Sequence, residues 1–84
     1  MNKRRLLARV AGNPAGARFE EMRSLVEAFG FQLARVKGSH HIYTRLGVPE
    51  LVNLQNVGGM AKAYQVRQFL KIVERRDLNL EESL

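Results

Sequence analysis

Apolar residues recur at intervals of three or four positions between residues 17 and 29. The apolar positions are Phe19, Met22, Leu25, Val26 and Phe29. This spacing places their side chains on one face of a helix and predicts that this face packs into the core. Gly30 comes directly after the last apolar position, where glycine commonly ends a helix.

A second amphipathic helix is predicted from about residue 61 to residue 76. Its apolar residues are Val66, Phe69, Leu70 and Val73, and its remaining positions include Lys62, Arg67, Lys71, Arg75 and Arg76. One face therefore suits the core. Arg67, Lys71 and Arg75 recur four positions apart, and they form either a stripe that contacts an RNA backbone or a solvated helix face.

Three short strands are predicted between the helices, at residues 31–37, 40–45 and 51–55. Apolar and polar residues alternate in them, although the alternation slips near Arg35. Gly38 and Ser39 separate the first two strands and predict a hairpin, and a turn centred on residues 47–49 precedes the third. Consecutive strands with such short connections pair antiparallel.

The predicted order of helix, three strands and helix gives an α+β fold of the α-β-β-β-α type, which resembles double-stranded RNA-binding domains. A three-stranded antiparallel sheet of this size cannot bury both faces. Both helices are therefore expected on one face, with the other face left open. The predicted domain covers residues 17–76, and residues 77–84 form a C-terminal tail with no assigned role.

Residues 1–16 are predicted to form a basic N-terminal arm. Lys3, Arg4, Arg5 and Arg9 lie in this segment, which contains no acidic residue. The segment ends in a turn-rich stretch from Gly12 to Gly16, which breaks any helix before it. The pattern leaves open whether the arm folds or is a solvated terminus.

The composition indicates a polyanion as the class of binding partner. The 84 residues include 14 basic and 8 acidic side chains, a formal net charge of +6, and arginine supplies most of the positive charge. Because the guanidinium group is flat and forked, it favours nucleic acid over a membrane surface. The absence of cysteine excludes disulfides and thiolate metal sites. No apolar stretch has the length of a membrane span or a signal peptide, so a cytoplasmic protein is expected.

His40 and His41 are the only histidines, and they open the predicted second strand. Imidazole exchanges protons near neutral pH, which makes these residues the candidates for acid–base chemistry. Strict strand alternation predicts that His40 and Ile42 face the core. The same alternation sends His41, Tyr43 and Arg45 to the open face.

Several segments resemble the HicA family of toxin–antitoxin ribonucleases. They are Phe29-Gly30-Phe31, Val36-Lys37-Gly38-Ser39-His40-His41-Ile42-Tyr43, Val52-Asn53 to Gly58-Gly59, and Ala63-Tyr64-Gln65-Val66-Arg67-Gln68. The resemblance implies an mRNA-cleaving toxin that uses one histidine, needs no metal or other cofactor, and is neutralised by a HicB-type antitoxin. It implies DNA contact only through an antitoxin complex, if at all. The family motif places the catalytic position directly after Gly-Ser, at His40, and His41 remains the rival.

A neutral imidazole is sufficient for RNA cleavage because RNA carries its own nucleophile. Removal of the 2′-hydroxyl proton starts attack on the adjacent phosphorus and leaves a 2′,3′-cyclic phosphate. The residues expected to bind RNA or assist around the histidine are Lys37, Ser39, Tyr43, Arg45, Lys62, Arg67 and Lys71. Gly58-Gly59 is interpreted either as a close approach for a phosphate before Lys62 or as a simple connection.

Two other functions remain open at this point. One is a non-catalytic RNA-binding module of the same shape, in which the histidines and arginines only contact the backbone and 2′-hydroxyl groups. The other is a chain whose only remaining role is antitoxin binding. A metal site is not expected, because no cysteine or carboxylate lies at ligand spacing from the histidine pair.

Overall fold

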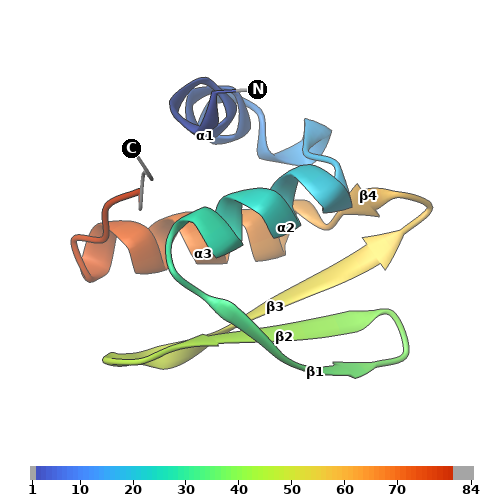
Figure 1. Ribbon diagram of the computed structural model, residues 1–84. Helices are drawn as coiled ribbons and strands as arrows, with labels where there is room; N and C mark the ends of the chain where they lie inside the picture. The colour runs from blue at the N-terminus through green and yellow to red at the C-terminus, as the bar shows by residue number, and fades with distance from the viewer. Residues whose placement is uncertain (1, 81–84) are drawn as a thin grey trace.

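Helices and strands lie in layers in the computed structural model, which describes residues 2–80 (Figure 1). The elements are α1 (Lys3–Gly12), a 3₁₀ turn η1 (Pro14–Gly16), α2 (Phe19–Ala28), β1 (Gln32–Lys37), β2 (His40–Arg45), β3 (Val48–Val57), β4 (Met60–Ala61) and α3 (Ala63–Arg75). Helices α2 and α3 cover one face of the sheet, and α1 lies on the far side of those helices from the sheet. The predicted α+β fold with both domain helices on one face is confirmed.

The core lies between the sheet and the helix pair. Every apolar position of the first predicted helix is buried, and the aromatic rings of Phe29 and Phe31 both meet Phe69 edge to face, with centroids 5.6 and 5.9 Å apart. Gly30 has a φ of 88° and donates its N–H to the carbonyl of Glu27, as expected of a glycine that ends a helix. The amphipathic pattern therefore identified both helices of the domain.

The sheet has four antiparallel strands in the order β1-β2-β3-β4, so the expectation of three strands was wrong. Gly58 and Gly59 have φ values of 58° and 87°, which suit a two-residue hairpin turn of type I′. The turn pairs Met60 with Val57 and so creates β4. A strand of two residues carries no alternation, which is why the sequence pattern missed it.

Strand β3 is longer than predicted and begins at Val48 instead of residue 51. Pro49 lies inside this strand, where the pairing with β2 is interrupted between Tyr43 and Arg45. Proline has no N–H to donate, so it is tolerated at such an irregularity. The slip near Arg35 also corresponds to a register shift, in the pairing of β1 with β2.

The N-terminal segment folds as helix α1, which answers the question that its pattern left open. The Asn2 side chain accepts a hydrogen bond from the N–H of Arg4 at 2.8 Å and caps the helix. Leu6 and Val10 are buried in the main core. Arg9 forms an ion pair with Glu21 of α2. Helix α1 is therefore a packed element of the fold.

Glu50 ties the start of β3 to the end of α3. Its carboxylate accepts hydrogen bonds from Arg76 at 2.9 Å and from Arg75 at 3.0 Å. The hydrogen bond from Arg76 has the largest effect, and together with the bond from Arg75 it lowers the pKa of the Glu50 carboxyl to about 2. Arg75 is therefore engaged in an ion pair and does not extend a free stripe with Arg67 and Lys71.

Candidate functional site

The strand register shows which side chains of β2 reach the open face of the sheet. Tyr43 pairs with Val52, and both are buried against the helices. Because side chains alternate along a strand, His40, Ile42 and Thr44 point to the opposite, open face. The predicted orientation of β2 was therefore wrong. The sequence pattern predicts Ile42 as the inward residue, but the structure buries the larger Tyr43 instead, and this sets the orientation of the strand.

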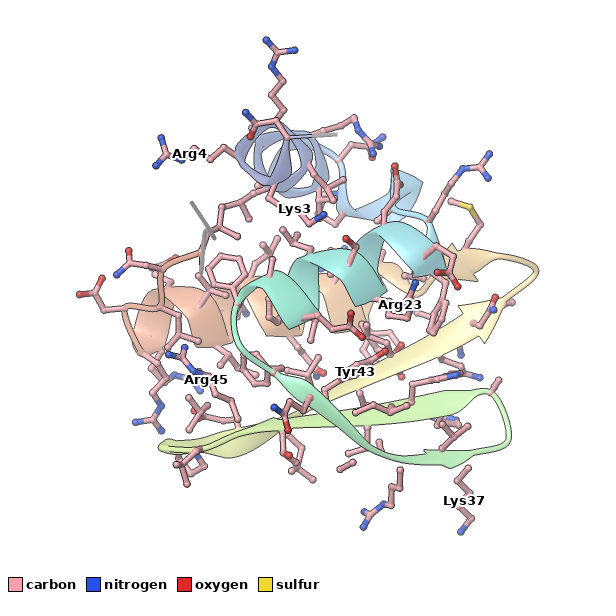
Figure 2. The ribbon with its side chains drawn as sticks, in the orientation of Figure 1. Lys3, Arg4, Arg23, Lys37, Tyr43 and Arg45 are labelled. Carbon is pink, nitrogen blue, oxygen red and sulfur yellow. The ribbon has the colours of Figure 1, made fainter. Side chains whose placement is uncertain are left out.

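Tyr43 lies in the core and cannot contact RNA at the surface. Its side chain is fully buried, between the sheet and α2 in the region of Arg23 (Figure 2). Its hydroxyl has no hydrogen-bond partner among residues 2–80, and burial raises its pKa. The expected role of Tyr43 in binding RNA or assisting a leaving group is excluded by this position.

Arg45 lies at the other end of β2 from His40, on the helix side. Five residues of strand separate the two, a distance of roughly 17 Å. One guanidinium nitrogen of Arg45 is buried without a hydrogen-bond partner in the part of the chain that the structure describes. The strand therefore does not bring Arg45 to a phosphate bound beside His40, as the sequence interpretation expected.

His40 occupies the open face and is held by a side chain of β3. Its Nδ1 lies 3.2 Å from Oδ1 of Asn53, and the ring is partly buried. An amide oxygen only accepts hydrogen bonds, so this contact requires the imidazole proton on Nδ1. In a neutral ring Nε2 then carries the free lone pair. The geometry thus presents an oriented proton acceptor.

His41 points to the other side of the sheet. Its ring packs against Phe19, the first residue of α2, with centroids 4.6 Å apart. Its Nδ1 lies 3.2 Å from the carbonyl oxygen of Ser39. Both ring contacts are with neighbouring structure, and they fasten the β1–β2 turn to α2.

Basic and polar side chains surround His40 on the open face. In the sheet register His40 pairs with Lys37 on β1 and with Gln55 on β3, and Arg35 pairs with Ile42. Directly paired residues share a face, so the side chains of Lys37 and Gln55 lie beside the imidazole, and Arg35 lies one pair farther along the same face. In Figure 2, Lys37 extends away from the helices. Strands β1 and β2 contain no acidic residue.

The Gly38–Ser39 turn brings Lys37 and His40 together. Gly38 has a φ of 60°, the conformation required at the first position of a two-residue type II′ turn, which glycine adopts at least cost. The Ser39 carbonyl accepts a hydrogen bond from the N–H of Asn56 at 3.1 Å and holds the turn against β3. The Ser39 side chain is exposed at the tip, next to His40.

The remaining expected contacts lie outside the open face. Arg67 and Lys71 are exposed on α3, in the helix layer, and Lys62 is the N-cap of that helix. In the Gly58-Gly59 turn, the N–H of Gly59 donates to Oδ1 of Asn56 at 2.8 Å. The turn therefore uses this N–H internally, which favours the simple connection over a phosphate cradle.

Sequence reasoning missed three residues of the site. Asn53, which contacts His40, was noticed only as part of a family segment, and Gln55 and Arg35 were assigned no role. The available signal was the hairpin register. A two-residue turn pairs Lys37 with His40. Val52 and Leu54 are buried, so the alternation of β3 places Asn53 on the other face of the sheet.

Neither a metal cluster nor a membrane span is found in the described residues. Among residues 2–80, no group of three or more His, Cys, Asp or Glu side chains is placed to hold a metal ion. In the same part of the chain, no helix is long and apolar enough to cross a membrane.

The comparison with protein families identifies a family that covers most of the domain. Residues 19–74, more than half of the chain, match the family described as HicA toxin of bacterial toxin-antitoxin. The matched region begins at α2 and ends within α3, so it includes the whole sheet and both histidines and leaves α1 outside. Comparisons with curated proteins and with solved structures give no match.

Proposed function

This chain belongs to the HicA family of bacterial toxin–antitoxin toxins, and we propose that it is an endoribonuclease that cleaves mRNA with His40 as general base. The observation that carries the proposal is the contact between His40 and Asn53 on the open sheet face. At this position the open face provides an oriented imidazole, a surface that no helix covers, and nearby positive charge. Those are the requirements for acting on a phosphodiester that carries its own 2′-hydroxyl.

The proposed reaction is an in-line transesterification. Nε2 of His40 accepts the 2′-hydroxyl proton while the 2′-oxygen forms a bond to phosphorus. The bond from phosphorus to the 5′-oxygen breaks, and that oxygen leaves as a hydroxyl after taking a proton from water. The resulting hydroxide takes the proton from Nε2 of His40, which restores water and the neutral imidazole. The products are a 2′,3′-cyclic phosphate and a 5′-hydroxyl end. Proton transfer by one such base contributes roughly 10²- to 10⁴-fold.

Positive charge beside His40 supplies the remaining stabilisation. The phosphoryl oxygens gain negative charge during the attack, and we assign their binding to Lys37; its pairing with His40 in the sheet supports this assignment. Arg35 lies one pair farther along the same face and can hold a neighbouring phosphate. Gln55 and the Ser39 side chain offer neutral hydrogen bonds to sugar and base.

His40 is preferred over His41 because of what each ring already contacts. Packing against Phe19 and the hydrogen bond to Ser39 place His41 on the helix side of the sheet, away from the surface that RNA would cross. No helix of residues 2–80 covers the open face of the sheet, to which His40 points (Figure 1). We therefore assign the base to His40 and a structural role to His41.

The proposed partner is a HicB-type antitoxin. A toxin of a toxin–antitoxin system is held inactive by its antitoxin, and the family assignment supports such a partner. Covering the open face would block access of RNA to His40. We place the activity in the cytoplasm because that is where mRNA is translated.

The test is cleavage of a long RNA by the purified chain in excess chelator. The unchanged chain should cut the RNA and leave cyclic phosphate ends, and His40→Ala should lose cleavage by at least 10²-fold while retaining its binding. His41→Ala serves as the control and should retain cleavage when its folding is confirmed by circular dichroism. If folded, unchanged protein binds RNA but leaves it intact, the chain is a non-catalytic RNA-binding module.

A further inference from the structure

A pocket lies at the end of the β1–β2 ladder that is opposite His40. It has a volume of about 710 Å³ and is lined by Gly30, Gln32, Thr44, Arg45 and Leu46. That volume is within the range of sites that hold small ligands. Gln32 and Thr44 are the last register pair of the ladder, whereas His40 belongs to the first pair beside the turn. The pocket is therefore separate from the candidate site.

Arg45 supplies a cation to this pocket. The residue is partly exposed, and it lies on the helix side of the sheet, at the end opposite Lys37 (Figure 2). One of its guanidinium nitrogens, Nη1, is buried and has no hydrogen-bond partner in the described part of the chain. Part of the charged group is thus removed from water without any hydrogen bond in return.

Other arginines of the fold are paired with carboxylates. Arg9 and Arg23 each form an ion pair with a glutamate. Glu50 lies on the helix side of β3, the strand next to Arg45, but its carboxylate is already bonded to Arg75 and Arg76. A cation that is partly removed from water without an anion costs free energy, and an anion that enters the pocket would recover it.

The pocket is continuous with the face that carries His40. Thr44 points to the open face, and its register partner Gln32 shares that face. A strand of RNA that crosses His40 and follows β2 therefore reaches the pocket at this last pair. The distance along β2 from His40 to Arg45 is roughly 17 Å, so a phosphate at Arg45 is not the phosphate at His40.

We propose that this pocket binds a second phosphate of the RNA strand, a few nucleotides away from the phosphate that is cut at His40. The forked guanidinium of Arg45 fits two oxygens of a phosphate, and it bonds through the nitrogens other than the enclosed Nη1. The contact raises the affinity for RNA that spans both places and leaves the chemical step unchanged. RNA as the source of the phosphate rests on the proposed function.

The test compares RNA binding by three variants in a His40→Ala background, which keeps the RNA intact. Arg45→Gln removes the charge from the pocket, and Arg45→Lys keeps the charge but loses the fork. Arg5→Gln is the matched control, because it removes one charge from an exposed residue of α1, on the far side of the helices from the sheet. The probes are a single-stranded RNA of about 12 nucleotides and a dinucleotide with one phosphate.

Arg45→Gln should weaken binding of the longer RNA about tenfold and lower the slope of log K against log salt by about 0.7, the value for one phosphate contact of a single strand. Arg45→Lys should keep the slope and lose part of the affinity. The dinucleotide should bind equally to all variants. Equal losses in Arg45→Gln and Arg5→Gln would overturn the proposal, because net charge alone would then explain the binding.

Thermal unfolding shows whether a loss of binding is a loss of folding. Arg45→Gln should melt at the same temperature as its parent or higher, because it removes a partly enclosed cation that has no anion. A melting temperature low enough to account for the lost affinity would overturn the proposal.

Inorganic phosphate distinguishes a free phosphate from a phosphate of RNA. Its titration should shift the NMR signals of the Gly30 and Leu46 amides, and the shifts should disappear in Arg45→Gln. If these shifts occur but Arg45→Gln binds the longer RNA as its parent does, the pocket takes free phosphate and the assignment to RNA is overturned.

Cleavage separates the failure of this proposal from the failure of the proposed function. With His40 restored, Arg45→Gln should raise KM for the longer RNA, leave kcat unchanged and cut the dinucleotide as the parent does. If the parent cuts no RNA but Arg45→Gln still lowers the affinity and the slope, the proposed function fails and the phosphate contact stands. If the parent cuts the longer RNA and Arg45→Gln changes neither KM nor the slope, the phosphate contact fails and the proposed function stands.

Discussion

Replacing Asn53 tests whether the orientation of His40 sets the rate of cleavage. Asn53 holds Nδ1 at 3.2 Å through an amide oxygen. In Asn53→Ala this hydrogen bond is lost, and the ring is free to rotate and to carry its proton on either nitrogen. A hydrogen bond of this kind contributes about 1 to 1.5 kcal/mol. If that energy is used to orient the base, kcat should fall roughly 5- to 10-fold.

Asn53→Asp places a negative charge at the same position. Two unit charges about 3.2 Å apart interact by about 1.3 kcal/mol in a medium of dielectric constant about 80, which is a tenfold change in a proton equilibrium. The carboxylate favours the protonated imidazole, and a protonated ring cannot act as a base. The acidic limb of the kcat/KM profile should therefore move to higher pH by about one unit, or more if the site is shielded from water.

The assay is cleavage of a fluorescent RNA by each variant from pH 5 to pH 9, under single-turnover conditions and in chelator. Leu51→Ala, on the same strand and the same face, is the control, because Leu51 lies four residues along β3 from Gln55, the register partner of His40. Its profile should match the parent profile. If Asn53→Asp leaves the acidic limb in place, His40 is not the base that Asn53 orients, and the reasoning fails.

Three further changes test the fold around the site. Tyr43→Phe should leave cleavage unchanged and stabilise the protein by up to about 1 kcal/mol in urea unfolding, because it removes a buried hydroxyl without a partner in the described residues; a loss of activity would contradict the core assignment. The lowered pKa of Glu50 means that its pairing with Arg75 and Arg76 stabilises the fold above its unfolded pKa near 4.5, with the contribution lost as pH falls toward about 2. Glu50→Gln should therefore reduce the pH dependence of the unfolding free energy in that window. An unchanged pH dependence would show that the pairing of Glu50 with the two arginines does not stabilise the fold. Leu6→Ala should cost about 2 to 4 kcal/mol, which tests the packing of α1, and a negligible cost in the same urea experiment would show that α1 is loosely attached.

The helices of the domain were predictable because their apolar spacing is regular and their burial is nearly complete. Phe19, Met22, Leu25 and Phe29 repeat on one face, and all four are buried. Helix α1 was harder to identify, because its two buried residues give too short a pattern to distinguish a packed helix from a solvated arm.

Alternation alone could not show which side chains of the second strand point toward the core. The period of two separates the side chains into two sets but does not say which set is buried. Ile42 and Tyr43 are both large and partly or wholly apolar, so the choice depends on the shape of the core, where Tyr43 fits under α2. The alternation of β3 indicates only the face on which Asn53 lies; its contact with His40 depends on the pairing of β2 with β3, and that register is visible only in the structure.

The central claim is that His40 removes the 2′-hydroxyl proton of RNA. The most direct measurement is the rate of cyclic phosphate formation from a long RNA in excess chelator by the unchanged chain, by His40→Ala and by His41→Ala, each with folding confirmed by circular dichroism. The account predicts cleavage by the unchanged chain and by His41→Ala, and a loss of at least 10²-fold in His40→Ala. Full activity in folded His40→Ala would contradict it.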